Sequence, residues 1–345
     1  MPLVPARGTD IDLGDIERPA RPRIYGALDL GTNNCRLLIA RRHGAGYRVI
    51  DAFSRIVRLG EGLEQKGWLS QAAMDRAVAA LAVCARKLSY RRVERLQAVA
   101  TEACRRASNG GLFLRRVRMQ TGLPLEVIGT AEEAALAYQS CAPLFESGRP
   151  HILVLDIGGG STEVSWLERQ AGEHAWKLHR CLSLPFGVVS LAERYGCRNI
   201  GEDHYQAMRF EAVTALRAFD PEGVLKRLAR QDALQLIGTS GTVTTLAGIH
   251  LGLPRYQRER VDGLHMTRDD IIIASRSVRR WSFSARAAHP CIGVQRADLV
   301  VAGSAIVEAV LALWPLARLR VADRGLREGM LAKMIEQDLA GPLKI

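Results

Sequence analysis

Hydrophobic and polar positions along the chain form short apolar runs separated by stretches with helical spacing. Apolar runs bounded by glycine, proline or polar residues predict buried strands. In the first half these runs cover residues 24–29, 36–40, 47–53, 96–101 and 125–129. In the second half they cover residues 151–156, 162–167, 178–184, 234–238 and 319–322.

Stretches with helical spacing separate these runs. Ser70 and Thr267 are good N-cap residues. Asp269 and Asp270 would lie in the first turn after Thr267, where the helix dipole favours acidic side chains. After Ser70, apolar residues recur every three or four positions, at Met74, Val78, Leu81, Ala85 and Leu88. Further helices are expected at residues 109–121, 132–141, 243–250, 298–313 and 326–338. Strands that alternate with helices in both halves predict an α/β fold.

The organisation of the chain follows from its length and from one polar segment. A chain of 345 residues is longer than one core usually covers, so two domains are expected. Residues 143–150 hold two prolines, a glycine and few apolar side chains, which places a boundary there. We expect a disordered leader at residues 1–23, a first domain at 24–145 and a second at 146–345. The final helix is a candidate to pack back on the first domain.

Composition narrows the location and the ligand class. No apolar run approaches the roughly 18 to 20 residues that span a bilayer, and the first 23 residues lack the apolar core of a secretory signal. The seven cysteines are scattered without a Cys-x-x-Cys pair, which indicates a reducing cytoplasm rather than a disulfide framework or zinc site. We therefore expect a cytoplasmic protein with no membrane partner.

The net charge of +12 favours an anionic partner. Arginines form clusters at residues 41–42, 91–95, 105–106 and 115–118. A solvated basic surface is the alternative interpretation of each cluster. Nucleic acid is disfavoured, because aromatic residues make up only 6% and no zinc-finger spacing or RNP-type aromatic motif is present. A phosphate-rich small molecule or polymer accounts for the charge at least as well.

The form apolar-apolar-Asp-apolar-Gly occurs twice, at Asp29 with Gly31 and at Asp156 with Gly158. Each copy ends the first strand of its half and opens a hairpin. Two similar domains that face each other across a cleft would bring both turns to one place.

The turn after Asp156 carries the strongest chemical signal. It reads Asp156, Ile157, Gly158, Gly159, Gly160, Ser161, Thr162 and Glu163. Three glycines let backbone N–H groups approach a ligand and form a concave anion site. The carboxylates of Asp156 and Glu163 beside a phosphate site make sense when a hard cation bridges them, and Mg²⁺ suits that role. The competing interpretation is a glycine turn with two surface acids.

Two further turns carry weaker signals. In the first, Asp29 could hold a metal-bound water, and Gly31, Thr32 and Asn33 could donate to phosphate. Arg36 either touches phosphate or only supports that turn. In the second, Gly238, Thr239 and Ser240 precede a helix whose dipole favours an anion, although a plain strand-to-helix turn competes.

Taken in order, these motifs resemble the exopolyphosphatase / guanosine pentaphosphate phosphohydrolase (Ppx/GppA) family of the actin and sugar-kinase superfamily. The resemblance covers almost the whole chain after residue 24. Its pieces are the two Asp-apolar-Gly turns, the Gly238 turn, and the stretches at residues 59–63, 99–105, 132–136, 185–189 and 323–329. Each piece alone is weak, and their common order is specific.

The resemblance implies two duplicated actin-like (ribonuclease H-like) domains with the active site in the cleft between them. It implies that Glu133 activates the attacking water, and that Asp156 and Glu163 are tied to Mg²⁺ and to the nucleophile. It also implies that Arg105 reaches into the cleft and that the backbone of residues 158–161 cradles phosphate.

The chain departs from the family pattern in two places. The first turn reads Thr-Asn-Asn-Cys where many relatives have Ser-Asn-Ser-Phe, with polarity conserved. Longer relatives add helical C-terminal domains, some with a His-Asp metal motif, and no His-Asp dipeptide occurs here. Processive action on long polymers is therefore not expected on this basis.

The expected function is Mg²⁺-dependent removal of terminal phosphate from inorganic polyphosphate. Hydrolysis of guanosine pentaphosphate is the first alternative, because both substrates present a terminal phosphoanhydride. An ATP-dependent kinase or ATPase, and a non-catalytic sensor of polyphosphate or an alarmone, are the others. A homodimer is a candidate assembly from the family.

Overall fold

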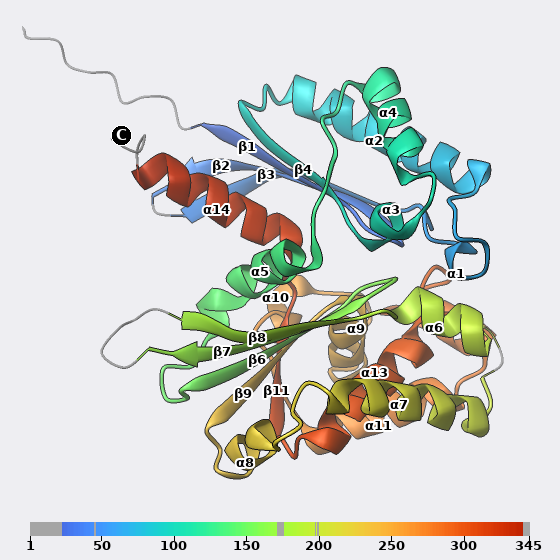
Figure 1. Cartoon of the computed structure of the whole chain (residues 1–345), viewed down its shortest axis with the longest axis vertical. Helices are drawn as coiled ribbons and strands as arrows, with labels where there is room; N and C mark the ends of the chain where they lie inside the picture. The colour runs from blue at the N-terminus through green and yellow to red at the C-terminus, as the bar shows by residue number, and fades with distance from the viewer. Residues whose placement is uncertain (1–22, 45, 171–175, 197, 199, 341–345) are drawn as a thin grey trace, which may run out of the picture.

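The computed structural model describes residues 23–44, 46–170, 176–196, 198 and 200–340 (Figure 1). Apart from residue 23, the leader expected at residues 1–23 lies outside the described residues. Among the described residues, no helix is long and apolar enough to cross a membrane.

The first sheet has the strand order β3-β2-β1-β4-β5. Its strands are β1 (Ile24–Leu30), β2 (Asn34–His43), β3 (Gly46–Ile56), β4 (Arg95–Ala100) and β5 (Glu126–Val127). The strands β1 to β3 are antiparallel, whereas β4 and β5 run parallel to β1 and to each other.

Successive side chains of β1 point to opposite faces of this sheet, and each face has its own core. Leu28 packs toward α2 (Gln71–Tyr90) and α4 (Gly110–Thr121). Ala27 packs toward α5 (Thr130–Cys141) and α14 (Leu326–Ala340). Figure 1 shows α14, in red at the C-terminal end, lying against this first sheet.

The second sheet has the order β10-β11-β9-β6-β7-β8. Its strands are β6 (His151–Ile157), β7 (Thr162–Arg169), β8 (Trp176–Leu184), β9 (Leu234–Thr239), β10 (His265–Thr267) and β11 (Arg318–Ala322). The strands β6, β7 and β8 form an antiparallel meander and β9 runs parallel to β6, which repeats the arrangement of β1 to β4.

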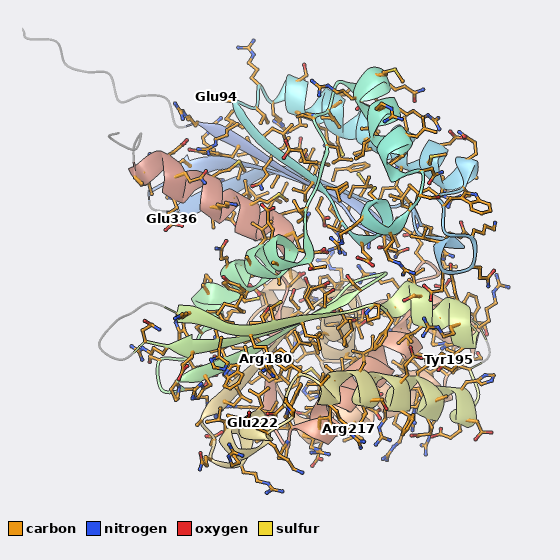
Figure 2. The ribbon with its side chains drawn as sticks, in the orientation of Figure 1. Glu94, Arg180, Tyr195, Arg217, Glu222 and Glu336 are labelled. Carbon is orange, nitrogen blue, oxygen red and sulfur yellow. The ribbon has the colours of Figure 1, made fainter. Side chains whose placement is uncertain are left out.

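Helices cover the second sheet on one face and α5 approaches it on the other. The covered face packs on α7 (Glu202–Arg217), α9 (Gly241–His250), α11 (Arg268–Arg280) and α13 (Val300–Leu313). The shorter elements are α1 (Leu63–Lys66), α3 (Glu102–Arg106), η1 (Ala142–Leu144), α6 (Val188–Tyr195), α8 (Val224–Arg230), α10 (Arg258–Val261) and α12 (Phe283–Ala288). Near the end of α6, Tyr195 lies beside α7 (Figure 2), and its hydroxyl donates to Glu211 at 2.8 Å.

The α/β fold predicted from the sequence is confirmed, together with several helix boundaries. Ser70 accepts a hydrogen bond from the Ala73 amide at 3.2 Å, and Thr267 accepts one from the Asp270 amide at 3.2 Å. Gly122 ends α4 with φ of 71°, a conformation that favours glycine. The domain boundary at residues 143–150 stays a prediction.

Candidate functional site

The two Asp-apolar-Gly turns have the same backbone geometry. In the first hairpin, Asp29 lies opposite Arg36 and the Gly31 amide donates to the Asn34 carbonyl at 2.9 Å. In the second, Asp156 lies opposite Glu163 and the Gly158 amide donates to the Ser161 carbonyl at 2.9 Å. The internal repeat seen in the sequence is therefore a structural repeat, and Arg36 occupies the position that Glu163 occupies in the second copy.

The two turns meet, and glycine is what allows them to. A Cβ on Gly159 would lie 3.0 Å from the Thr32 Cβ, and one on Gly160 would lie 2.9 Å from the Thr32 hydroxyl oxygen. On the other side, a Cβ on Gly187 would lie 2.3 Å from the Gly158 carbonyl oxygen. The second turn is therefore packed between Thr32 and Gly187, where only glycine fits without displacement.

Three acids gather beside this turn. Burial raises the pKa of Asp156 to about 8, and repulsion from Glu163 and Asp29 adds to the rise. Burial also raises the pKa of Glu163, whose carboxylate accepts a hydrogen bond from Ser183 at 2.9 Å. Burial and the nearby Glu163 raise the pKa of Glu133 to about 9. The site concentrates acidic groups in a buried place, where burial disfavours their ionised form and favours a bound proton or cation.

Arg105 connects Glu133 on α5 to α3 within the first lobe, which is the first sheet with the helices packed on it; the second lobe is the second sheet with α6 to α13. One Nη atom lies 3.1 Å from Glu133 Oε2 and donates to the Ile128 carbonyl at 2.7 Å. The rest of its guanidinium donates to Glu102, with Nε at 3.1 Å. Arg105 is thus fixed between two buried acids, and it lowers the pKa of Glu133 against the effect of burial.

The third turn lies between β9 and α9. The Ser240 side chain accepts hydrogen bonds from the amides of Thr242 and Val243, at 3.1 and 3.2 Å, and so caps α9. The Thr239 hydroxyl donates to the Arg324 carbonyl. Gly238 lies within β9, where a Cβ would meet Leu319 and Val243 at 3.0 Å. A packing role accounts for Gly238 without any ligand.

A cavity of about 510 Å³ unites these parts. Of the residues selected from the sequence, those that line it are Asp29, Gly31, Thr32, Asn33, Arg36, Glu133, Asp156, Gly158, Gly159, Gly160, Ser161, Glu163, Thr239 and Ser240. Arg105 and Gly238 are not among the lining residues, so Arg105 acts on the cavity through Glu133 and Glu102. Asn33 Oδ1 is buried with no hydrogen-bond partner among the described residues.

The sequence interpretation missed part of the lining. Glu102, Tyr256, Arg296, Arg324 and Arg327 also face the cavity. Arg324 and Arg327 lie in the stretch at residues 323–329, which marked the family resemblance but received no role. Tyr256 and Arg296 lie in segments without a glycine-hydroxyl motif, so no local signal indicated them.

The donor set fits a hydrated divalent cation better than a closed protein cage. Among the described residues, no group of three or more His, Cys, Asp or Glu side chains is arranged to hold a metal ion. Mg²⁺ keeps several waters and binds through one or two carboxylates together with substrate phosphates. Asp156 and Glu163, opposite each other across the hairpin, supply such a pair.

Comparison with known proteins gives a consistent result. A family model described as the Ppx/GppA phosphatase family matches residues 38–338. The crystal structure of the Aquifex aeolicus member of that family is 27% identical with a TM-score of 0.73, and the match covers 92% of this chain and 98% of that one. An exopolyphosphatase from Cytophaga hutchinsonii is 26% identical with a TM-score of 0.80, and the match covers 91% and 98%.

Proposed function

The chain belongs to the Ppx/GppA phosphatase family, and we propose that it is an exopolyphosphatase, which hydrolyses the terminal phosphoanhydride bond of inorganic polyphosphate with Mg²⁺. Family membership supports a hydrolase that acts on phosphate anhydrides. The likeness to the Cytophaga exopolyphosphatase supports polyphosphate as the substrate.

One observation carries the proposal. Glu133, with its side chain only 10% exposed, faces the same cavity as Asp156, Glu163 and both hairpin turns. A buried carboxyl group held beside a backbone anion site is suited to general base catalysis of phosphoryl transfer.

In this mechanism the backbone amides of the second turn bind the terminal phosphoryl group, and Ser161 adds a hydroxyl donor. Glu133 orients a water molecule and accepts its proton as the water oxygen bonds to phosphorus. The P–O bond to the remaining chain breaks, which releases orthophosphate and a chain shorter by one phosphate. Arg105 holds Glu133 in place and lowers the pKa of that carboxyl group.

Asp156 and Glu163 would hold Mg²⁺, which supplies positive charge to phosphate oxygens when bound. The repulsion that these acids exert on Glu133 raises the pKa of Glu133, so a cation paired with them brings that pKa back toward neutral.

Guanosine pentaphosphate hydrolysis is the second candidate, and one observation favours it. The cavity continues beyond the turns to Tyr256, Pro290 and Ile292, whose apolar surface could accept a base. A linear polyphosphate gains nothing from such a surface.

The test is phosphate release by the purified protein with Mg²⁺ from long-chain polyphosphate, tripolyphosphate, guanosine pentaphosphate and ATP. Glu133→Gln keeps the shape of the side chain and should lower turnover by at least about 10²-fold. Glu132→Gln is the matched control, since that neighbouring glutamate pairs with Lys333 and is not among the lining residues of the cavity.

Release from polyphosphate that persists in Glu133→Gln would remove the role assigned to Glu133. Preferred release from guanosine pentaphosphate would replace the substrate assignment. Tight binding of polyphosphate without release from any substrate would favour the sensor.

A further inference from the structure

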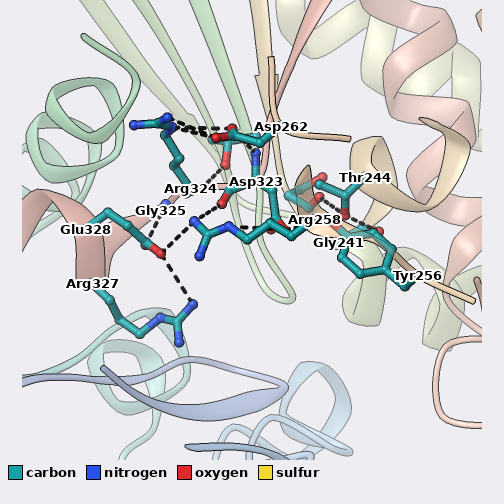
Figure 3. A network of polar contacts seen from close by, with 12 residues as sticks. Gly241, Thr244, Tyr256, Arg258, Asp262, Asp323, Arg324, Gly325, Arg327 and Glu328 are labelled. Atoms are coloured by element: carbon teal, nitrogen blue, oxygen red, sulfur yellow. Dashed lines mark hydrogen bonds and ion pairs between the residues drawn. The ribbon is translucent and has the colours of Figure 1, made fainter. Parts of the chain in front are cut away.

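Arg327 occupies an unusual place in the molecule. It lies in the first turn of α14, just after the chain crosses from β11 of the second sheet toward the first sheet. Its side chain is only 19% exposed and lines the cavity. Figure 3 shows one nitrogen of its guanidinium directed at Glu328, close to the guanidinium of Arg258.

The charge of Arg327 is poorly compensated. Among the described residues, the one carboxylate within 4.0 Å of its guanidinium is that of Glu328, whose Oε1 lies 3.7 Å away. That carboxylate is already engaged by Arg258 at 3.3 Å and by the Gly325 amide at 3.0 Å (Figure 3). Burial lowers the pKa of Arg327, and repulsion from Arg36 and Arg258 opposes the attraction of Glu328 and Asp29, which raises that pKa.

Arg324, three residues earlier in the same segment, has a carboxylate partner. Its Nε and Nη2 atoms make three contacts with Asp262, at 2.9, 3.1 and 3.3 Å (Figure 3). A buried guanidinium normally has such a partner, because an unpaired buried charge is costly. Among the described residues, Arg327 has only the shared Glu328 carboxylate at 3.7 Å, and it faces an open cavity.

The first hairpin adds a second cation to the same place. Arg36 lies opposite Asp29, and both Arg36 and Arg327 interact electrostatically with that buried carboxyl group. Both arginines therefore face Asp29, while Arg36 also interacts with Asp156 and Arg327 with Glu328. Glu133, Asp156 and Glu163 form a separate acidic group around the second turn.

We propose that Arg327 binds the phosphate groups of the substrate that are not attacked, and so holds the polyanion against the first hairpin. A guanidinium binds phosphate through two parallel hydrogen bonds, which suits a buried fork with free donors. The charged groups that most affect the pKa of Glu133 are Glu163, Arg105 and Asp156, so the attacked phosphoryl group belongs beside these residues. The proposal rests on the proposed function for the nature of the polyanion.

The experiment measures equilibrium binding of tripolyphosphate with Mg²⁺ in a Glu133→Gln background, where turnover is removed. Arg327→Met should weaken binding by roughly 10- to 100-fold, the effect of losing charge-assisted hydrogen bonds. Arg327→Lys should recover part of the affinity, since it restores the charge without the fork. Lys333→Met, on the same helix and paired with Glu132 on the surface, removes the same charge and should change affinity less than twofold.

Thermal unfolding without metal or ligand separates binding from a structural role. Arg327→Met should melt at or above the wild-type temperature, because it removes a poorly compensated charge. Arg324→Met should melt at a lower temperature, because it leaves the Asp262 carboxylate without its guanidinium partner. Unchanged affinity in Arg327→Met and Arg327→Lys, or a large loss of stability in Arg327→Met matching that of Arg324→Met, would overturn the proposal.

The outcome is separable from that of the proposed function. If the wild-type protein releases no phosphate but Arg327→Met loses tripolyphosphate binding, the role of Arg327 stands and the hydrolase assignment falls. If polyphosphate is hydrolysed and its KM is unchanged in Arg327→Met, the assignment stands and the role of Arg327 falls.

Discussion

At the scale of single residues, Asp156 couples the chemistry of the site to stability. Its pKa rises from 3.8 to about 8, so the folded protein binds that proton more tightly than the unfolded chain does. The contribution to the free energy of unfolding is present in full below about pH 4 and is lost as pH rises through about 8. The metal-free protein should therefore become less stable across this range, as thermal unfolding in a chelator will measure.

Asp156→Asn tests whether Asp156 causes this dependence of stability on pH. The variant no longer titrates, so its melting temperature should vary less between pH 5 and pH 8 than that of the wild type. Mg²⁺ at pH 8 should stabilise the wild type more than the variant, because binding to the folded state shifts unfolding. The same change of melting temperature with pH in both proteins would show that groups other than Asp156 cause it.

The role of a residue could be predicted from the sequence where a local motif indicates it. Glu133, Asp156 and Glu163 were found because motif spacing and the family resemblance indicate them. The Arg105–Glu133 pairing and the single distant ion pair of Arg327 were not, because they depend on tertiary packing. Arg105 reaches the Ile128 carbonyl and Glu133 on a later helix, and no pattern within the Glu102–Arg106 helix specifies those contacts.

At the scale of elements, the second hairpin is held against the N-terminus of α6. The amides of Val188 and Val189 donate to the carbonyls of Gly158 and Gly159, at 3.0 and 2.8 Å. The phosphate turn therefore depends on a helix that carries no catalytic side chain.

Gly187→Ala should displace this turn. The added methyl group would meet the Gly158 and Gly159 carbonyl oxygens at 2.3 and 2.7 Å, and overpacking of this kind costs about 1–3 kcal/mol. We expect a lower melting temperature and a loss of turnover larger than the loss of stability explains. Gly201→Ala is the matched control, since Gly201 also precedes a helix and a Cβ there meets nothing within 4 Å. Equal effects of the two substitutions would contradict the argument.

The elements that the sequence predicted well are those with strong local signals. Strands bounded by glycine turns and helices capped by Ser70 or Thr267 fall within a few residues of their expected limits. The expected helices do not include α1, α3, α6, α7, α8, α10 and α12. For α7 the signal was present, because Tyr205, Met208, Ala212 and Leu216 recur at helical spacing and are buried. For α6, a short helix whose first turn packs on a glycine loop, tertiary contacts decide the conformation.

At the scale of the whole molecule, polar contacts join the two lobes beside the cavity. Glu193 on α6 accepts a hydrogen bond from the Gly62 amide at 2.9 Å. Glu64 on α1 accepts from Arg194 of the second lobe at 2.7 Å and from Arg106 of the first at 3.0 Å. Arg58 pairs with Asp298 at 3.1 Å. These contacts lie on segments that flank the turns, so they favour a closed arrangement of the lobes.

Glu64→Gln should weaken closure, because it removes the ion pair with Arg194 of the second lobe together with the one with Arg106 of the first. Ion pairs at the surface contribute about 0.2–1 kcal/mol each, so losing the pair with Arg194 shifts the closed population by a few-fold at most. A closed cavity aligns phosphate with Glu133, and we therefore expect KM for polyphosphate to rise about two- to fivefold with a small change in melting temperature. X-ray scattering without ligand should give a larger radius of gyration.

Asp75→Asn provides the comparison, because Asp75 pairs with Arg116 entirely within the first lobe. It removes one carboxylate charge from a surface pair, as Glu64→Gln does, but leaves every contact between the lobes intact. If both variants change KM equally, the effect belongs to net charge and the attraction of the polyanion. If Glu64→Gln alone raises KM and expands the molecule, the ion pair between α1 and α6 sets how often the catalytic groups meet.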